Sequence, residues 1–166
     1  MAERLQPSLL DRLTDNEPEQ KTETVDRREF TPEYLRQSVR RDLAWLFNTV
    51  NLVTTQDLDP YPEVANSVLN YGVGDLTGKS VSSIDVGAAE RMLRDAILTY
   101  EPRLLRKSVR VELVGDREQV RYNQLCFNIH AQLWAEPLPL RLMLRTELNL
   151  ETGDASVSEV AGAEVD

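Results

Sequence analysis

The residues best suited to chemistry in this chain are an acid and a base on either side of a proline, Glu101-Pro102-Arg103. Glu101 falls where a helix is expected to end, and the helix macrodipole disfavours a negative charge at that position. A guanidinium two residues further on would offset this cost. Because proline restricts the backbone between the two charged groups, they can form a rigid unit at a corner between a helix and a strand.

Two interpretations of this corner stay open on the sequence alone. The first is a helix end with a surface ion pair, which contributes at most about 1 kcal/mol. The second is a contact with another protein, because a basic cluster in an acidic chain attracts a partner's carboxylates. That cluster consists of Arg103, Arg106, Lys107 and Arg110. The candidate protein-binding residues are Glu101, Pro102, Arg103, Arg106 and Lys107.

The basic cluster from Arg103 to Arg110 could also bind RNA. A formal net charge of −9 weakens this alternative, because an acidic protein repels phosphates. No aromatic residues alternate with the basic ones, although single-stranded nucleic-acid sites commonly use them for base stacking.

Catalytic motifs are scarce in this sequence. It contains one histidine and one cysteine, and it lacks the spacing of a serine hydrolase, a zinc protease or a P-loop. Cys126 and His130 would lie on one face of a strand but about 13 Å apart, which is too far for proton transfer. We therefore expect no catalytic residue, no metal ligand set and no cofactor.

A glycosidase would need two carboxylates on either side of a sugar. The chain has 28 Asp and Glu residues, so some pair will always be available and its presence is not evidence. Aromatic residues for sugar stacking make up only 6% of the chain. Three of them, Trp45, Phe47 and Phe127, fall at positions expected in or near the core.

The composition is that of one domain in a reducing compartment. The chain has 166 residues, of which 41% are hydrophobic, enough for a core of ordinary size. A single cysteine cannot close an intramolecular disulfide. Since no apolar run is long enough for a signal peptide or a membrane span, we expect a soluble cytoplasmic protein.

The first long helix is predicted over residues 32–48. Thr31 is a suitable N-cap, Pro32 suits the first helical position, and apolar residues then recur every three or four positions. The opposite face of this helix is either solvated surface or an interface. It carries Arg36, Arg40, Arg41 and Asp42.

A second helix is predicted over residues 85–100, after a loop over residues 51–82 that holds one short helix near residues 63–69. Ser82 or Ser83 is expected to cap the second helix. It must end near Tyr100 because Pro102 disfavours helix at the residue before it.

Beyond Pro102 the apolar residues alternate with polar ones, which predicts antiparallel strands. The strands are expected near residues 109–113, 125–133, 140–150 and 156–160, with a bulge near Asn123 or Gln124. Helices followed by a meander indicate an α+β fold, with two main N-terminal helices packed on a C-terminal antiparallel β-meander of about four strands.

The two ends of the chain differ from this central domain. Residues 1–29 are expected to form a docking peptide, with an apolar stripe at Leu9, Leu10 and Leu13, and a flexible linker with almost no apolar side chains. The domain is expected over residues 30–160, and residues 161–166 are expected to form a disordered acidic tail.

Three stretches, in this order, resemble one known family. They are Ser67-Val68-Leu69-Asn70-Tyr71-Gly72 followed by Asp75-Leu76, then Tyr100-Glu101-Pro102-Arg103-Leu104, then the Glu-Pro-Leu-Pro-Leu and Leu-Glu-Thr-Gly segments. Over residues 5–160 the chain resembles the TssE family of type VI secretion systems, baseplate wedge subunits of the lysozyme-like baseplate family that is shared with contractile phage tails.

This resemblance implies a structural role in which the subunit joins the baseplate wedge to the first ring of the contractile sheath. The Glu-Pro-Arg motif, here Glu101, Pro102 and Arg103, would contact the wedge subunits TssF and TssG. The sheet would be a template for strands of the sheath proteins TssB and TssC. Contacts with TssK and the spike hub stay open, and so does the enzymatic alternative of a muramidase acting on peptidoglycan.

Overall fold

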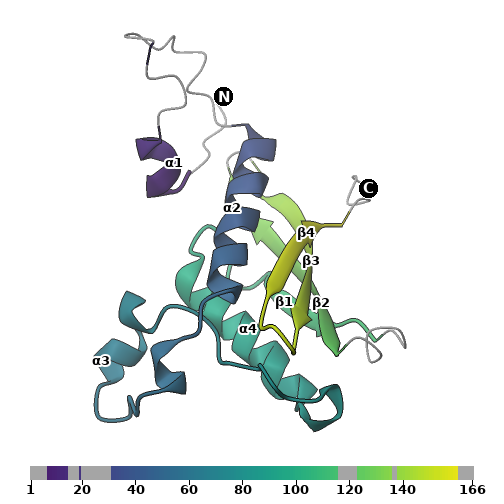
Figure 1. Ribbon diagram of the computed structural model, residues 1–166. Coiled ribbons are helices and arrows are strands. Elements are labelled where there is room, and N and C mark those ends of the chain that lie inside the picture. Colours follow the sequence, from purple (N-terminus) through teal and green to yellow (C-terminus); the bar gives the residue numbers. More distant parts are fainter. Residues whose placement is uncertain (1–6, 15–18, 20–30, 116–122, 136–137, 161–166) are drawn as a thin grey trace.

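The computed structural model describes residues 7–14, 19, 31–115, 123–135 and 138–160. In these residues, two long helices pack on one face of an antiparallel four-stranded sheet (Figure 1). The helices are α2 (Pro32–Phe47) and α4 (Val86–Tyr100), and the strands are β1 (Arg110–Leu113), β2 (Gln124–Leu133), β3 (Leu140–Asn149) and β4 (Ala155–Glu159). The strands follow one another in the sheet in chain order. The predicted α+β fold is confirmed. The predicted acidic tail at 161–166 lies outside the described residues.

The beginning of helix α2 is fixed by a capping residue and a proline. The Thr31 side chain accepts a hydrogen bond from the Tyr34 N–H, and Pro32 occupies the first turn. The apolar stripe faces the sheet and is buried, as shown by Leu35, Val39, Leu43 and Leu46. The prediction of a helix over residues 32–48 is therefore confirmed to within one residue.

Short helical turns interrupt the loop between α2 and α4. They are η2 (Leu52–Thr54), α3 (Pro62–Ala65), η3 (Val68–Asn70) and η4 (Val81–Ser83). The loop is fastened to the end of α2, because the Val73 N–H donates to the Thr49 carbonyl and Gly72 lies against the same group. Gly72 has φ +124°, and a Cβ there would lie 2.3 Å from the Thr49 oxygen, so only glycine fits.

Helix α4 is capped by Asp85, whose carboxylate accepts from the Ala88 N–H at 3.1 Å. The prediction that Ser82 or Ser83 caps this helix is therefore wrong. Those serines belong to the separate turn η4, and the chain is extended at Ile84 before the helix begins. The predicted end at Tyr100 is confirmed.

The sheet buries alternate residues of each strand against the helices. In β2 the inward residues Phe127, Ile129 and Leu133 are fully buried, while His130 lies on the open face. The sequence predicts a bulge near Asn123 or Gln124, but Gln124 already pairs one for one with Asn149 of β3, and Asn123 directly before it is a turn residue with φ +51°. Residues 116–122, which precede this turn, lie outside the described part.

The two edges of the sheet differ in how well they are covered. At the β1 edge, side chains of α4 bind the outward backbone groups: Glu90 accepts from the Leu113 N–H at 2.8 Å and Arg94 donates to the Val109 carbonyl at 3.4 Å. At the β4 edge, Asn48 binds both the N–H and the carbonyl of Ala155, at 2.9 and 2.7 Å.

Beyond Ala155 the β4 edge is open within the described residues. Outward backbone groups recur at every second residue of an edge strand, so Val157 and Glu159 direct theirs the same way as Ala155. No hydrogen bond from a described residue outside the strand reaches them. Glu159 is also exposed, so a short free edge remains at the end of β4.

Candidate functional site

Glu101 and Arg103 form a closed unit at the corner that follows α4. The Arg103 backbone N–H and its Nε donate to Glu101 Oε1 at 3.1 and 2.7 Å, and its Nη2 donates to Oε2 at 2.5 Å. This bidentate pairing is the strong geometry for a guanidinium and a carboxylate. Pro102, between them, is exposed. The predicted pairing of the two charges is thus present.

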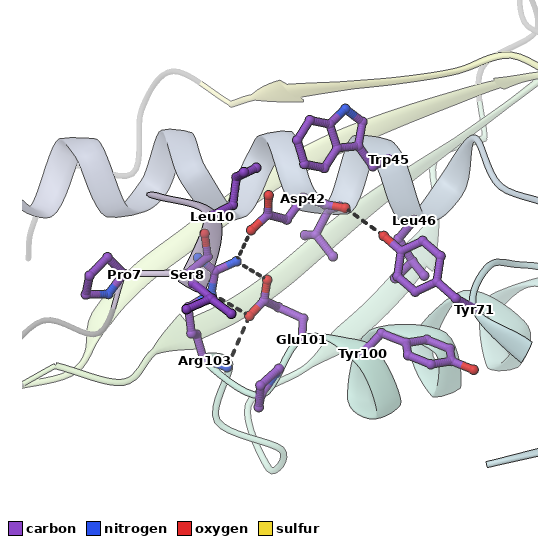
Figure 2. Close-up of a pocket in the computed structure, with 13 residues that line it drawn as sticks. Pro7, Ser8, Leu10, Asp42, Trp45, Leu46, Tyr71, Tyr100, Glu101 and Arg103 are labelled. Atoms are coloured by element: carbon purple, nitrogen blue, oxygen red, sulfur yellow. Dashed lines mark hydrogen bonds and ion pairs between the residues drawn. The ribbon is translucent and has the colours of Figure 1, made fainter. Parts of the chain in front are cut away.

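Arg103 also joins this corner to α2. Its Nη2 donates to Asp42 Oδ2 at 2.5 Å and its Nη1 to Ser38 Oγ at 2.9 Å (Figure 2 draws the pairing with Asp42). Burial by itself lowers the pKa of Arg103. The hydrogen bonds and negative charges of Glu101 and Asp42 raise this pKa by more than burial lowers it, so the guanidinium stays charged.

The corner pair is not a surface ion pair. Glu101 is 4% exposed and the Arg103 side chain 10%. That interpretation of the helix end is therefore wrong, because α2 covers the carboxylate and supplies a second acid, Asp42. Removing one member of a buried pair leaves an uncompensated charge, which costs about 3–5 kcal/mol.

The helix α1 (Leu9–Leu13) is bound to the other side of the same network. Ser8 caps it, and Asp11, only 5% exposed, accepts from Arg41 Nη1 at 2.7 Å and from the hydroxyl of Ser38. Burial alone raises the pKa of Asp11, but hydrogen bonds from Arg41, Ser38 and Ser8 lower it well below its usual range.

Ser38 is the link between the two halves of this network. Its hydroxyl donates to Asp11 and accepts from Arg103, and its side chain is buried in the middle of α2. The chain of contacts therefore runs from α1 through α2 to the corner after α4. Asp11, within the segment expected to form a docking peptide and a flexible linker, is a structural residue of this network. Arg41 and Asp42, for which solvated surface and an interface both remained open, are internal partners.

A pocket of about 500 Å³ lies beside the corner, between α1, α2 and the end of α4 (Figure 2). Its walls are mainly apolar or aromatic, with Leu10, Leu46, Tyr71, Tyr100 and Pro102 among the lining residues. Trp45 stands at its rim, 51% exposed, with the Arg41 guanidinium 5.0 Å from its ring. The expectation that Trp45 lies near the core is wrong, because it points away from the sheet-facing stripe of α2. Phe47 and Phe127 are buried as expected.

The basic residues that follow the corner do not all belong to it. Arg106 is exposed and donates to the Leu98 carbonyl near the end of α4 at 2.8 Å. Lys107 and Arg110 line a different groove on the open face of the sheet. The structure thus brings Glu101, Pro102 and Arg103 together and separates them from Lys107 and Arg110.

Neither Cys126 nor His130 lines the pocket beside Glu101. No group of three or more His, Cys, Asp or Glu side chains within the described residues could hold a metal ion. Cys126 is 2% exposed and His130 faces the other groove. No helix in the described part of the chain is long and apolar enough to cross a membrane.

Exposed aromatic and aliphatic side chains beside an apolar pocket are a common feature of protein-binding surfaces. Residues 33–138 match the family of the baseplate wedge protein gp25. Because this match covers more than half of the chain, the chain belongs to that family, which also contains the TssE proteins. Comparison with curated proteins and with solved structures gives no match.

Membership gives the chain a structural role in a baseplate. The matched residues contain α2 except its first residue, Pro32, together with α4, β1, β2 and the corner between α4 and β1. Helix α1 and strands β3 and β4 lie outside the match, so their contribution rests on the structure.

Proposed function

We propose that the chain is the wedge subunit of a type VI secretion baseplate, joining TssF and TssG to the first ring of the TssB–TssC sheath. In this proposal it has no enzymatic activity, helps to start sheath assembly, and works in the cytoplasm on a baseplate docked at the inner membrane. The observation that carries the proposal is the apolar pocket beside Glu101-Pro102-Arg103 in a chain of the baseplate wedge family.

At the proposed wedge contact, the buried and the exposed residues of the corner have different roles. Glu101 and Arg103 are buried and hold the backbone turn in place, so they contribute mainly by fixing its shape. The exposed residues around them are those a partner can touch: Pro102, Trp45 and Leu10. Exposed aromatic residues beside a preformed pocket are common anchors of protein interfaces.

Co-purification with TssF and TssG tests this contact. Trp45→Ala removes a side chain that is 51% exposed and touches the buried network at the Arg41 guanidinium, which keeps its ion pairs with Asp11 and Asp42. We therefore expect a folded protein that retains at most about a tenth of the wedge binding. Tyr61→Ala is the matched control, because Tyr61 is 60% exposed but lies outside the pocket. If the Trp45 variant bound the wedge as well as the Tyr61 control does, the pocket would not be the wedge contact.

Glu101→Ala and Arg103→Ala should also lose TssF and TssG. Because both side chains are buried, these variants must be compared at equal folded fraction, measured by circular dichroism. Normal co-purification of both folded variants would argue against any role of the motif in the wedge.

Sheath binding by strand addition is supported at β4, whose end is open, whereas α4 side chains cover the β1 edge. Glu159→Pro removes an outward N–H without disturbing pairing with β3, so it should weaken co-sedimentation with TssB–TssC. Glu159→Ala keeps the N–H and should bind normally. Equal binding by the two variants would exclude this edge.

A muramidase is the enzymatic alternative. Glu101, the acid at the corner, is 4% exposed and fully engaged by Arg103, so a glycan strand would not reach it. We expect the purified protein to leave peptidoglycan intact. Clearing of peptidoglycan that disappears in Glu101→Gln would favour the enzyme.

A further inference from the structure

The face of the sheet opposite α2 and α4 carries a basic groove. This groove has a volume of about 700 Å³ and is lined by residues of β1, β2, β3 and the segment before β1. Its charged residues are Lys107, Arg110, Arg141 and Glu112, and His130 of β2 also lines it. None of these residues lines the pocket beside Glu101.

Strand register fixes this arrangement. Arg110 of β1 is paired with His130 of β2, and His130 is paired in turn with Met143 of β3. Arg141 pairs with Gln132, two residues along from His130, so its side chain emerges on the same face. The groove is therefore a built feature of three paired strands.

The cations of the groove are not neutralised within the described part of the chain. No ion pair there involves Lys107, Arg110 or Arg141, and both arginines are exposed. Three positive charges face one carboxylate, that of Glu112, in a chain whose net charge is −9. Such a local reversal of sign attracts an acidic partner and orients its approach.

We propose that this groove binds an acidic segment of another protein. The two guanidiniums can each bind a carboxylate through parallel hydrogen bonds, and Met143 and Leu105 offer apolar contact for the stems of acidic side chains. A nucleic acid fits less well, because no Phe, Tyr or Trp lines the groove for base stacking. This surface is separate from the proposed wedge and sheath contacts, so its test does not depend on theirs.

Binding of a fluorescent polyglutamate peptide at low ionic strength tests the proposal by fluorescence anisotropy. Charge reversal in Arg110→Glu/Arg141→Glu should lower the affinity at least about tenfold. The matched control is Arg40→Glu/Arg91→Glu, which changes the net charge equally at exposed helix positions outside the groove. We expect the control to lose no more than about threefold, from long-range charge alone.

His130 supplies a second readout, because it is the single histidine of the chain and lines the groove. Its ring resonances in an NMR titration should shift when the peptide is added to the wild type and the control variant, but not to the groove variant. An equal loss of affinity in both double variants, or an unmoved His130 signal in the wild type, would overturn the proposal. Tighter binding of a single-stranded DNA oligonucleotide of the same length would overturn it in favour of a nucleic acid.

Discussion

Arg103 holds three polar groups in place from one side chain: the carboxylates of Glu101 and Asp42 and the hydroxyl of Ser38. Glu101 caps the end of α4, whereas Asp42 and Ser38 both lie on α2, so the guanidinium fixes the path of the chain between α4 and β1 relative to α2. A planar group with several fixed donors suits this role better than an ammonium.

Truncation in Arg103→Ala should destabilise the fold strongly. Two carboxylates would lose their shared guanidinium in a site where the Arg103 side chain is only 10% exposed, at a cost of about 3–5 kcal/mol. Urea unfolding followed by circular dichroism measures the loss. Arg106→Ala, at an exposed neighbour, should change stability by no more than about 0.5 kcal/mol. Similar values for the two variants would contradict the structural role of Arg103.

Asp11 makes the fold sensitive to acid. The pKa of Asp11 is lower in the folded protein than in the unfolded chain, where it is about 3.9, so the folded state binds protons less readily. Its contribution to stability is therefore complete above that unfolded value and is lost as the pH falls below it. The stability difference between wild type and Asp11→Asn should be constant from about pH 7 to about pH 5 and should shrink as the pH falls below about 4, toward the lower folded pKa. A difference independent of pH would show that the charge of Asp11 does not hold α1.

The pairing of Glu101 with Arg103 could be predicted because the two residues are two positions apart in the sequence, directly at the end of a helix. Asp42 and Asp11 could not, since they come from other helices whose distance from the corner depends on packing. One signal was available in α2. Ser38 interrupts the buried side of its apolar stripe, and a buried hydroxyl needs partners.

At the scale of elements, the helices and strands followed from periodicity because each has one face in the core. The cap of α4 did not, since Ser82, Ser83 and Asp85 are all suitable caps and the turn η4 decides between them. Helix α1 is too short to be stable alone, so its position depends on the contacts of Asp11 with α2.

Asn48 should control how firmly β4 is held. Its side chain binds both backbone groups of Ala155, so Asn48→Ala leaves this edge unfastened and should cost about 1–2 kcal/mol locally. Hydrogen exchange at the Ala155 amide measures the effect and should accelerate about fivefold or more. Asn66→Ala, which removes only a local bond to the Pro62 carbonyl, is the control and should leave that amide unchanged. Unchanged exchange in both variants would contradict the role of Asn48.

At the scale of the whole molecule, three surfaces are made of different residues: the pocket between the helices, the free end of the β4 edge and the basic groove on the open sheet face. The proposed role, which links a wedge to a sheath, requires separate contacts of this kind. The sequence indicated the charged corner but not the groove, because Arg141 joins Arg110 only through the pairing of β1, β2 and β3.

Photo-crosslinking in a reconstituted wedge with bound sheath tests the central claim most directly. A photoreactive residue in place of Trp45 should cross-link to TssF or TssG, and one in place of Glu159 should cross-link to TssB or TssC. The same photoreactive residue in place of Tyr61, which lies in the loop between α2 and α4 and outside the pocket, should give neither product. Sheath products from the Trp45 position, wedge products from the Glu159 position, or no products from either would contradict the account.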